Sequence, residues 1–332
     1  NRVLIKPSEF TPRSSELLAR LIGGQFDPEQ ISVVNGGSEV SQAFCAQPFD
    51  HLLFTGATSV GRQVMRAAAD NLVPVTLELG GKSPAIISRS ADMRVAVAKI
   101  LTGKAHNAGQ ICLSPDYVFI PEERMDDFVS IALDTLTPHF PTLLNNPDYT
   151  SIINARHYAR LLQYIQQARE AGVEVTALNP ANEDFSNQPH YKMPITLLRD
   201  PGDELQVMQD EIFGPILPFK PYKRIEDVID YVNKRPRPLA LYWFGNDEKE
   251  EELVLDRTTS GGVTINNVIR HIGVDTLPFG GIGASGMGAY HGREGFLTFS
   301  HAKAVFRPVE GPDIMCPPFT ANRDAVRSLI TP

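Results

Sequence analysis

The sequence has few of the residues that build metal centres, disulfide frameworks or membrane spans. Its three cysteines, Cys45, Cys112 and Cys316, form no metal-binding pair and are too few for a disulfide framework, which favours a reducing compartment. Its eight histidines form no HExxH motif and no cluster with cysteine, so we expect no metal. No apolar stretch approaches the ~18 residues that span a bilayer, and the first residues do not form a signal peptide. These absences predict a cytoplasmic protein with no membrane partner.

The chain also lacks the basic runs that neutralise nucleic-acid phosphates. Its formal net charge is −8, which makes nucleic acid a poor candidate partner and a small molecule a better one. At 332 residues, with 42% hydrophobic residues, it is long enough for two packed units or one large α/β unit with an added lobe.

The first eighty residues alternate short β-branched runs with helical patterns. The pattern predicts strands at 3–5, 31–34, 51–54 and 75–79, separated by helices at 14–22, 38–46 and 59–71. Strands joined by helix-length crossovers indicate a parallel sheet covered on both faces. A doubly wound cofactor fold normally has two βαβαβ halves, so we expect that the N-terminal part of this one is missing from the chain.

A second α/β region follows the Gly80-Gly81 pair. It has an expected helix at 93–108 and strands at 117–120 and 239–244. The closely spaced glycines from Gly280 to Gly295 predict tight turns or close backbone approach rather than a plain helix. The proline-rich tail from Pro308 is typical of an extended arm.

Two residues are candidates for catalysis. Cys112 lies in a short polar, glycine-containing stretch, 107–115, where a thiol can be exposed, although a lone cysteine is catalytic only about one time in ten. Glu78 interrupts the apolar strand 75–79. It is either a glutamate at the polar end of a strand or a desolvated carboxylate of raised pKa, which is what a general base requires.

Two further segments are candidates for cofactor binding. Lys6 and Glu9 directly follow the first strand, at the strand edge where doubly wound sheets bind nucleotides. Gly56 and Gly61 lie in a strand-to-helix connection whose backbone N–H groups can meet a pyrophosphate. The GxGxxG fingerprint is absent, and an ordinary βα turn is the more common explanation of such a segment.

Taken together, six motifs resemble those of the aldehyde dehydrogenase superfamily over residues 1 to about 307. They are Lys6-Pro7-Ser8-Glu9, Phe54-Thr55-Gly56, Glu78-Leu79-Gly80-Gly81-Lys82-Ser83-Pro84, Gly109-Gln110-Ile111-Cys112, Glu211-Ile212-Phe213-Gly214-Pro215 and Leu277-Pro278-Phe279-Gly280-Gly281. The glycine-dense run from Gly283 to Phe296, followed by Phe299-Ser300-His301-Ala302-Lys303, looks most like the coniferyl-aldehyde dehydrogenase branch.

The resemblance implies a role for each candidate residue. Cys112 would be the nucleophile and Glu78 the base. The cofactor would be NAD or NADP. The resemblance implies that Lys6 and Glu9 contact its adenosine ribose, and that Gly56, Gly61 and their turn contact its pyrophosphate. Glu211 and Phe213 would contact the nicotinamide riboside, and Asn266 would be a site-supporting residue.

The resemblance also implies an architecture and partners. It divides the chain into the C-terminal part of an NAD(P)-binding domain (1–80), a catalytic thiol domain (81–282) and a C-terminal return and oligomerisation segment (283–332). It implies an aldehyde substrate, aromatic and coniferaldehyde-like, and a homodimer or higher homo-oligomer. Two departures stand out: Ala57 replaces a phosphate-contacting serine, and the family's oxyanion asparagine would lie before residue 1.

Two other interpretations stay open. The chain could be a truncated or non-catalytic aldehyde dehydrogenase-like protein, because fold does not guarantee function. A nucleotide-binding or nucleic-acid-binding module without redox chemistry has less support, given the acidic charge and the pairing of Cys112 with Glu78.

Overall fold

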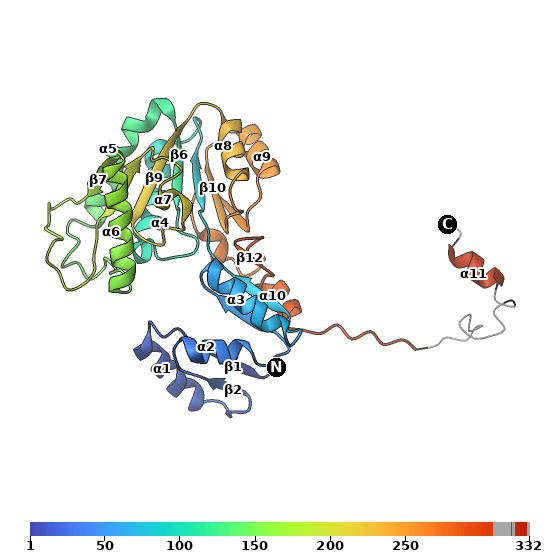
Figure 1. Cartoon of the computed structure of the whole chain (residues 1–332). Coiled ribbons are helices and arrows are strands. Elements are labelled where there is room, and N and C mark those ends of the chain that lie inside the picture. The colour runs from blue at the N-terminus through green and yellow to red at the C-terminus, as the bar shows by residue number, and fades with distance from the viewer. Residues whose placement is uncertain (308–319, 321–322, 331–332) are drawn as a thin grey trace. The chain divides into compact units, whose positions relative to one another are not determined.

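Three β-sheets organise residues 1–299 of the computed structural model, which describes residues 1–307, 320 and 323–330 (Figure 1). The strands are β1 (Val3–Ile5), β2 (Ile31–Val33), β3 (Leu52–Thr55), β4 (Val75–Glu78), β5 (Pro84–Ile87), β6 (Tyr117–Pro121), β7 (Glu174–Leu178), β8 (Ile195–Arg199), β9 (Ile216–Tyr222), β10 (Ala240–Phe244), β11 (Gly262–Ile265) and β12 (Gly286–Met287).

The α-helices join and cover these strands. They are α1 (Pro12–Gly23), α2 (Ser38–Cys45), α3 (Thr58–Ala69), α4 (Met93–Ala105), α5 (Met125–His139), α6 (Ala155–Glu170), α7 (Gln206–Gln209), α8 (Ile225–Asn233), α9 (Glu248–Arg257), α10 (Gly292–Thr298) and α11 (Arg323–Ile330). Three short 3₁₀ segments lie at His106–Gly109, Glu122–Arg124 and Arg270–Gly273. The helix α11 belongs to a separate unit, residues 300–332.

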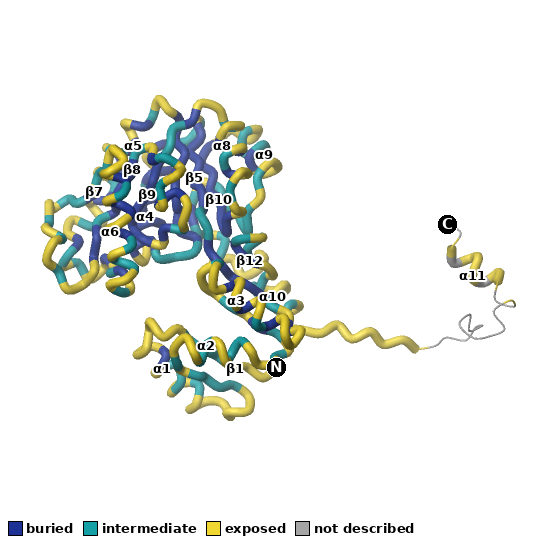
Figure 2. Tube along the Cα trace, viewed as in Figure 1, coloured by how far each residue is buried: buried dark blue, intermediate teal, exposed yellow. Residues whose placement is uncertain are grey.

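The largest sheet has seven strands in the order β11-β10-β5-β6-β9-β8-β7. Every neighbouring pair is parallel except β7 with β8. The strands β5, β6 and β10 are buried along their whole length, as expected for parallel strands covered on both faces. Figure 2 shows that the buried residues concentrate around these strands.

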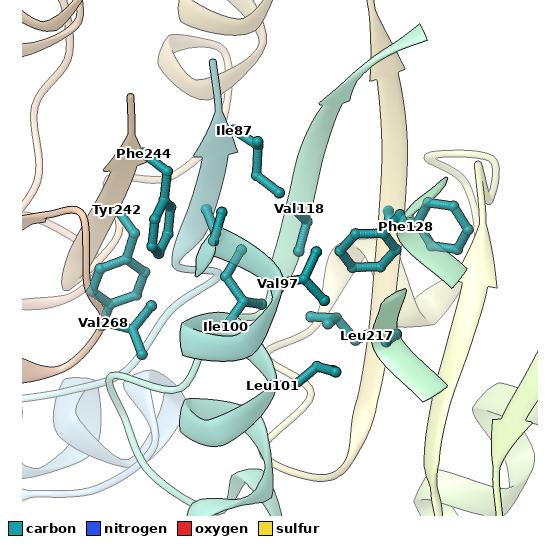
Figure 3. Close-up of a cluster of buried hydrophobic side chains, with 14 of the residues drawn as sticks. Ile87, Val97, Ile100, Leu101, Val118, Phe128, Leu217, Tyr242, Phe244 and Val268 are labelled. Carbon is teal, nitrogen blue, oxygen red and sulfur yellow. The ribbon is translucent and has the colours of Figure 1, made fainter. Parts of the chain in front are cut away.

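Helices supply the covering layer on each face of the large sheet. On one face, Val97, Ile100 and Leu101 of α4 pack with strand residues that include Ile87 and Val118 (Figure 3). On the other face, side chains of α6, α8 and α9 join a second buried cluster around Trp243. These two apolar layers make the sheet a rigid platform for the loops at its strand ends.

The first eighty residues follow the predicted elements closely but not as one sheet. The strands β1 and β2 form a parallel pair, whereas β3 and β4 form a separate parallel sheet with β12 added antiparallel to β4. The chain then changes sheets between Glu78 and Pro84, through Gly80 and Gly81. The expectation of a single parallel sheet before residue 80 is therefore corrected to two.

Two further expectations need correction. The helix predicted at 93–108 ends at Ala105, because Asn107 and Ala108 adopt left-handed backbone conformations that no α-helix contains. The glycine-dense run contains not only turns but also β12 and the helix α10, which includes Gly292 and Gly295. The predicted arm from Pro308, like Cys316, lies outside the described residues. Within the described part of the chain, no helix has the length and apolarity to cross a membrane.

The helix α5 allows a matched test of this packing. Leu136 is 2% exposed in the main core, whereas Leu133, on the same helix, is 43% exposed. We expect Leu136→Ala to lower the free energy of unfolding by about 2–5 kcal/mol and Leu133→Ala by less than about 1 kcal/mol, as measured by urea denaturation. Equal losses in the two variants would contradict the described burial.

Candidate active site

The candidate nucleophile follows a strained turn at the end of α4. Asn107, Ala108 and Gly109 have φ values of 51°, 51° and 72°, so three consecutive residues are left-handed. Such conformations cost a non-glycine residue on the order of 1–3 kcal/mol and persist only where the surroundings enforce them. At Gly109 the need for glycine is also steric, because a Cβ there would lie 2.4 Å from the carbonyl oxygen of Gly214.

Cys112 is partly buried and packs against the main apolar core. Burial, followed by the charges of Glu211 and Glu78, raises the pKa of its thiol to about 11. Backbone N–H groups of Cys112 and Leu113 act in the opposite direction and favour the thiolate. The structure thus brings Cys112, Glu78 and Glu211 close enough for their charges to interact, although they are far apart in the sequence.

Glu78 ends β4 and is only 3% exposed. Neither of its carboxyl oxygens has a hydrogen-bond partner among the described residues. Burial raises the pKa of this carboxyl to about 8. A buried carboxyl without partners is costly for folding, and a pKa near neutrality is what a general base needs.

Glu211 lies on the loop between α7 and β9. Its carboxylate rests against Gly80, where a Cβ would lie 2.1 Å from Oε2. Burial and the negative charge of Asp116 raise the pKa of Glu211 to about 8, although a hydrogen bond from the Gly81 N–H acts to lower it. Two residues later, Phe213 has a φ of 46° and is 38% exposed, so its ring is available to a ligand.

Lys6 and Glu9 follow β1 directly and pair with each other. The Lys6 Nζ lies 3.1 Å from Glu9 Oε2. A backbone hydrogen bond and the Lys6 partner lower the pKa of Glu9, so its carboxylate is ionised at neutral pH.

The two glycines predicted to bind the cofactor, Gly56 and Gly61, lie in different elements: Gly56 directly follows β3, and Gly61 lies within α3. The Gly56 N–H donates a hydrogen bond to Glu78 O, 3.0 Å away, which ties the turn after β3 to the strand that carries Glu78. Gly61 lies inside α3, where a Cβ would meet the side chain of Leu79 at 2.7 Å. The described contact of Gly61 is therefore helix-to-strand packing. The N-cap of α3 is Ala57, and no side chain caps its first N–H groups.

Asn266, at the end of β11, has a φ of 54°. Its side chain makes two hydrogen bonds of 2.9 Å with the backbone of Gly245, one as donor and one as acceptor. The described role of this side chain is to join the ends of β10 and β11.

Sequence reasoning missed a group of buried charges behind the site. Lys82 pairs with Asp116, whose second oxygen accepts the Ile212 N–H at 2.9 Å. Lys104, on α4, is fully buried, and its amine has no hydrogen-bond partner among the described residues. Burial lowers the pKa of Lys104 to about 8, against the opposing influence of Asp116 and Glu211. Only its position in an otherwise apolar helical stretch signalled this lysine in the sequence.

A cavity of about 740 Å³ borders the cysteine loop. Its walls come from the ends of α4 and α5 and from the loop residues before Cys112. They include Leu101, His106, Ile111, Leu136, His139 and Phe140. This volume lies within the range of small-molecule sites, which are about 300–1,000 Å³.

The match to a family model identifies the class of protein. Residues 1–305 match the model of the aldehyde dehydrogenase family, and the chain belongs to that family. It is 57% identical over 310 residues to a probable coniferyl aldehyde dehydrogenase of Caulobacter vibrioides, covering 93% of this chain and 64% of that protein. It is 56% identical over 305 residues to a coniferyl aldehyde dehydrogenase of a Pseudomonas species, covering 92% and 63% respectively.

Solved structures show the same fold. The substrate-bound state of Staphylococcus aureus AldH matches with a TM-score of 0.91 and 37% identity, covering 100% of this chain and 71% of that one. A Mycobacterium tuberculosis aldehyde dehydrogenase complexed with NAD⁺ matches with a TM-score of 0.83 and 29% identity, covering 94% and 64%. The chain thus spans a little under two thirds of the length of its curated relatives.

The carboxylates around Cys112 predict a pH-dependent effect on its reactivity. Since the Glu211 pKa is about 8, the carboxylate disfavours the Cys112 thiolate above that pH and has little effect well below it. We expect Glu211→Gln to speed alkylation of Cys112 by iodoacetamide several-fold at pH 9.5 and not at pH 6.5, as followed by peptide mapping. The exposed Glu174→Gln is the control. An unchanged rate at pH 9.5 would show that the two side chains do not interact.

Proposed function

We propose that this chain carries the thiol chemistry of an NAD(P)-dependent oxidation of an aldehyde to the carboxylic acid. The observation that supports it best is the juxtaposition of the Cys112 thiol with the buried, unpartnered carboxyl of Glu78. A structural glutamate gains nothing from such a position, whereas a general base gains the raised pKa that burial provides.

The described residues fit a dinucleotide at several separate points. The N-terminus of α3 has no side-chain cap, which suits its first backbone N–H groups to a pyrophosphate. The ionised Glu9 suits ribose hydroxyls, and the exposed ring of Phe213 lies two residues from Glu211. When bound, NAD(P) supplies the hydride acceptor. Glu9 disfavours the 2′-phosphate of NADP, while Lys6 beside it favours that group, so we propose NAD or NADP.

Cys112 carries the first step. After the thiol loses its proton to solvent, its sulfur adds to the aldehyde carbon as the carbonyl π bond breaks, and a thiohemiacetal oxyanion forms on the chain. Loss of the C–H hydrogen as hydride leaves a thioester on the same sulfur. A bound NAD(P) would supply a positively charged nicotinamide. If Glu211 holds that part of the cofactor, as the resemblance implies, the charge would oppose the two carboxylates that raise the pKa of the Cys112 thiol and would favour the thiolate.

Glu78 carries the second step. Its carboxylate accepts a proton from a water molecule as the water oxygen adds to the thioester carbonyl. Collapse of that adduct breaks the carbon–sulfur bond, which releases the carboxylic acid and restores the Cys112 thiolate. The base is needed only if water is the acyl acceptor, so Glu78 favours acid rather than acyl transfer to another thiol.

The cavity beside the cysteine loop supports an aromatic substrate. Its lining includes the aromatic ring of Phe140 and the polar residues His106 and His139. An aromatic aldehyde with ring hydroxyl or methoxy groups, such as coniferaldehyde, matches this mixture. The names of the relatives from Caulobacter and Pseudomonas agree with this substrate class. We also propose that this chain forms a homo-oligomer, as the resemblance to the family implies.

The glutamate substitution tests the proposed function directly. Because Glu78 acts after hydride transfer, we expect Glu78→Gln to keep a first-turnover burst of reduced cofactor while steady turnover falls at least ~100-fold. The thioester should accumulate as a mass adduct on Cys112. With the wild-type chain, turnover should rise with pH and level off above about 8, where Glu78 is ionised.

The exposed Glu174→Gln again serves as the control. Unchanged turnover in Glu78→Gln, with no adduct, would reject the base. Absence of both NAD(P) binding and turnover in the wild-type chain would instead favour the non-catalytic alternative.

A further inference from the structure

The side chain of Gln110 ties the cysteine loop to the segment that leads into α6. Its Nε2 donates to Ser151 O at 2.9 Å and to Asn107 O at 3.0 Å, and its Oε1 accepts the Ile153 N–H at 2.9 Å. The Asn107 Nδ2 in turn donates a hydrogen bond to Gln110 O at 3.0 Å. Every hydrogen-bonding atom at the end of the Gln110 side chain is therefore used, and the left-handed turn before Cys112 is tied to residues 151–153.

Arg160, on α6 itself, ties down a second loop. Its guanidinium donates to Ile212 O at 2.8 Å and to Glu211 O at 3.4 Å. It also donates to the Tyr164 hydroxyl at 3.1 Å, which in turn donates to Asp210 Oδ2 at 3.0 Å. Three consecutive residues, 210–212, are thus held from one helix.

The two loops also touch each other directly. A Cβ at Gly109 would lie 2.4 Å from Gly214 O, and a Cβ at Gly214 would lie 2.5 Å from the side chain of Leu161 on α6. The cysteine loop therefore packs against the Glu211 loop, which in turn packs against α6, and a glycine lies at each of these two contacts.

The helix α6 is itself well anchored. Its N-cap Asn154 accepts the His157 N–H at 2.9 Å, and Leu161 and Ile165 are buried in the second apolar cluster. It can therefore act as a fixed reference for both loops.

From these contacts we propose that α6 with residues 151–153 is a positioning element, in which Gln110 sets the placement of the Cys112 thiol and Arg160 that of the Glu211 carboxylate. The two residues act through separate bonds and on separate loops. Gln110 therefore controls the nucleophile, and Arg160 controls the cofactor side of the site. The interpretation of the Glu211 loop as a contact to the cofactor rests on the proposed function.

The test compares Gln110→Met and Arg160→Met with Gln166→Met. Gln166 is an exposed residue of α6 whose side chain donates a hydrogen bond to Glu170 at 2.8 Å, its one hydrogen-bond partner among the described residues. For each variant we would measure iodoacetamide alkylation of Cys112, the Kd for NAD⁺, steady-state kinetics with coniferaldehyde, and stability in urea.

For Gln110→Met we expect opposite changes in two readouts. Released from its strained turn, the thiol becomes less buried, so alkylation should rise about fivefold or more. The kcat should fall about 10- to 100-fold, because the thiol is no longer held for attack, with little change in the Kd for NAD⁺. For Arg160→Met we expect the Kd for NAD⁺ to rise about tenfold, with partial recovery in Arg160→Lys. Alkylation at pH 6.5, where the Glu211 carboxyl is protonated, should stay within twofold of wild type.

If Gln110 and Arg160 had only a structural role, each Met variant would change alkylation, the Kd for NAD⁺ and kcat together, in proportion to its loss of stability in urea. The proposal is overturned if Gln110→Met matches Gln166→Met in alkylation and kcat, or if both Met variants show one common pattern. Should Gln110→Met fail to fold, Gln110→Glu replaces it, since its carboxyl still accepts the Ile153 N–H. Failure of the proposed function is distinguishable, because a wild-type chain without NAD⁺ binding or turnover still reports the Gln110 effect through alkylation.

Discussion

The close approach of Gly109 to the carbonyl oxygen of Gly214 is the constraint on which the rest of the site depends. It brings the loop with Cys112 against the loop with Glu211, so that a carboxylate acts electrostatically on the thiol. No side chain fits between the two backbones. The left-handed turn at Asn107 and Ala108 follows from the same contact, because it directs the chain from α4 into that space.

The site is also rich in buried titratable groups. Glu78 and Glu211 have pKa values raised to about 8, and Lys104 has one lowered to about 8, all chiefly by burial. Such groups weaken a fold, and proteins retain them where function requires them. The rigid seven-stranded sheet, with an apolar layer on each face, provides the compensating stability.

The chemistry of the site is divided between the sheets. Glu78 ends a strand of the three-stranded sheet, whereas Cys112 and Glu211 lie on loops of the seven-stranded sheet. The change of sheet at Gly80 and Gly81 therefore lies at the centre of the site, and Glu211 rests directly against Gly80. A substitution at this connection would disturb both the carboxylate and the relation of the two sheets.

The sequence by itself was enough to identify the family and most strands and helices, and it was the basis for proposing Cys112 and Glu78 as the reacting residues. Those properties depend on local hydrophobic pattern and on motifs that are continuous in the chain. It predicted neither the division of the first eighty residues into two sheets nor the early end of α4, because strand pairing and a left-handed turn depend on distant partners.

The surroundings of Gln110, Arg160 and Lys104 were likewise visible only in the tertiary structure. Gln110 bonds to Ser151 O, 41 residues away, and Arg160 to Ile212 O, 52 residues away, while Lys104 lies within electrostatic range of Asp116 and Glu211. Hydrogen bonding and desolvation act through space, so a residue's surroundings, rather than its neighbours in sequence, determine what it does.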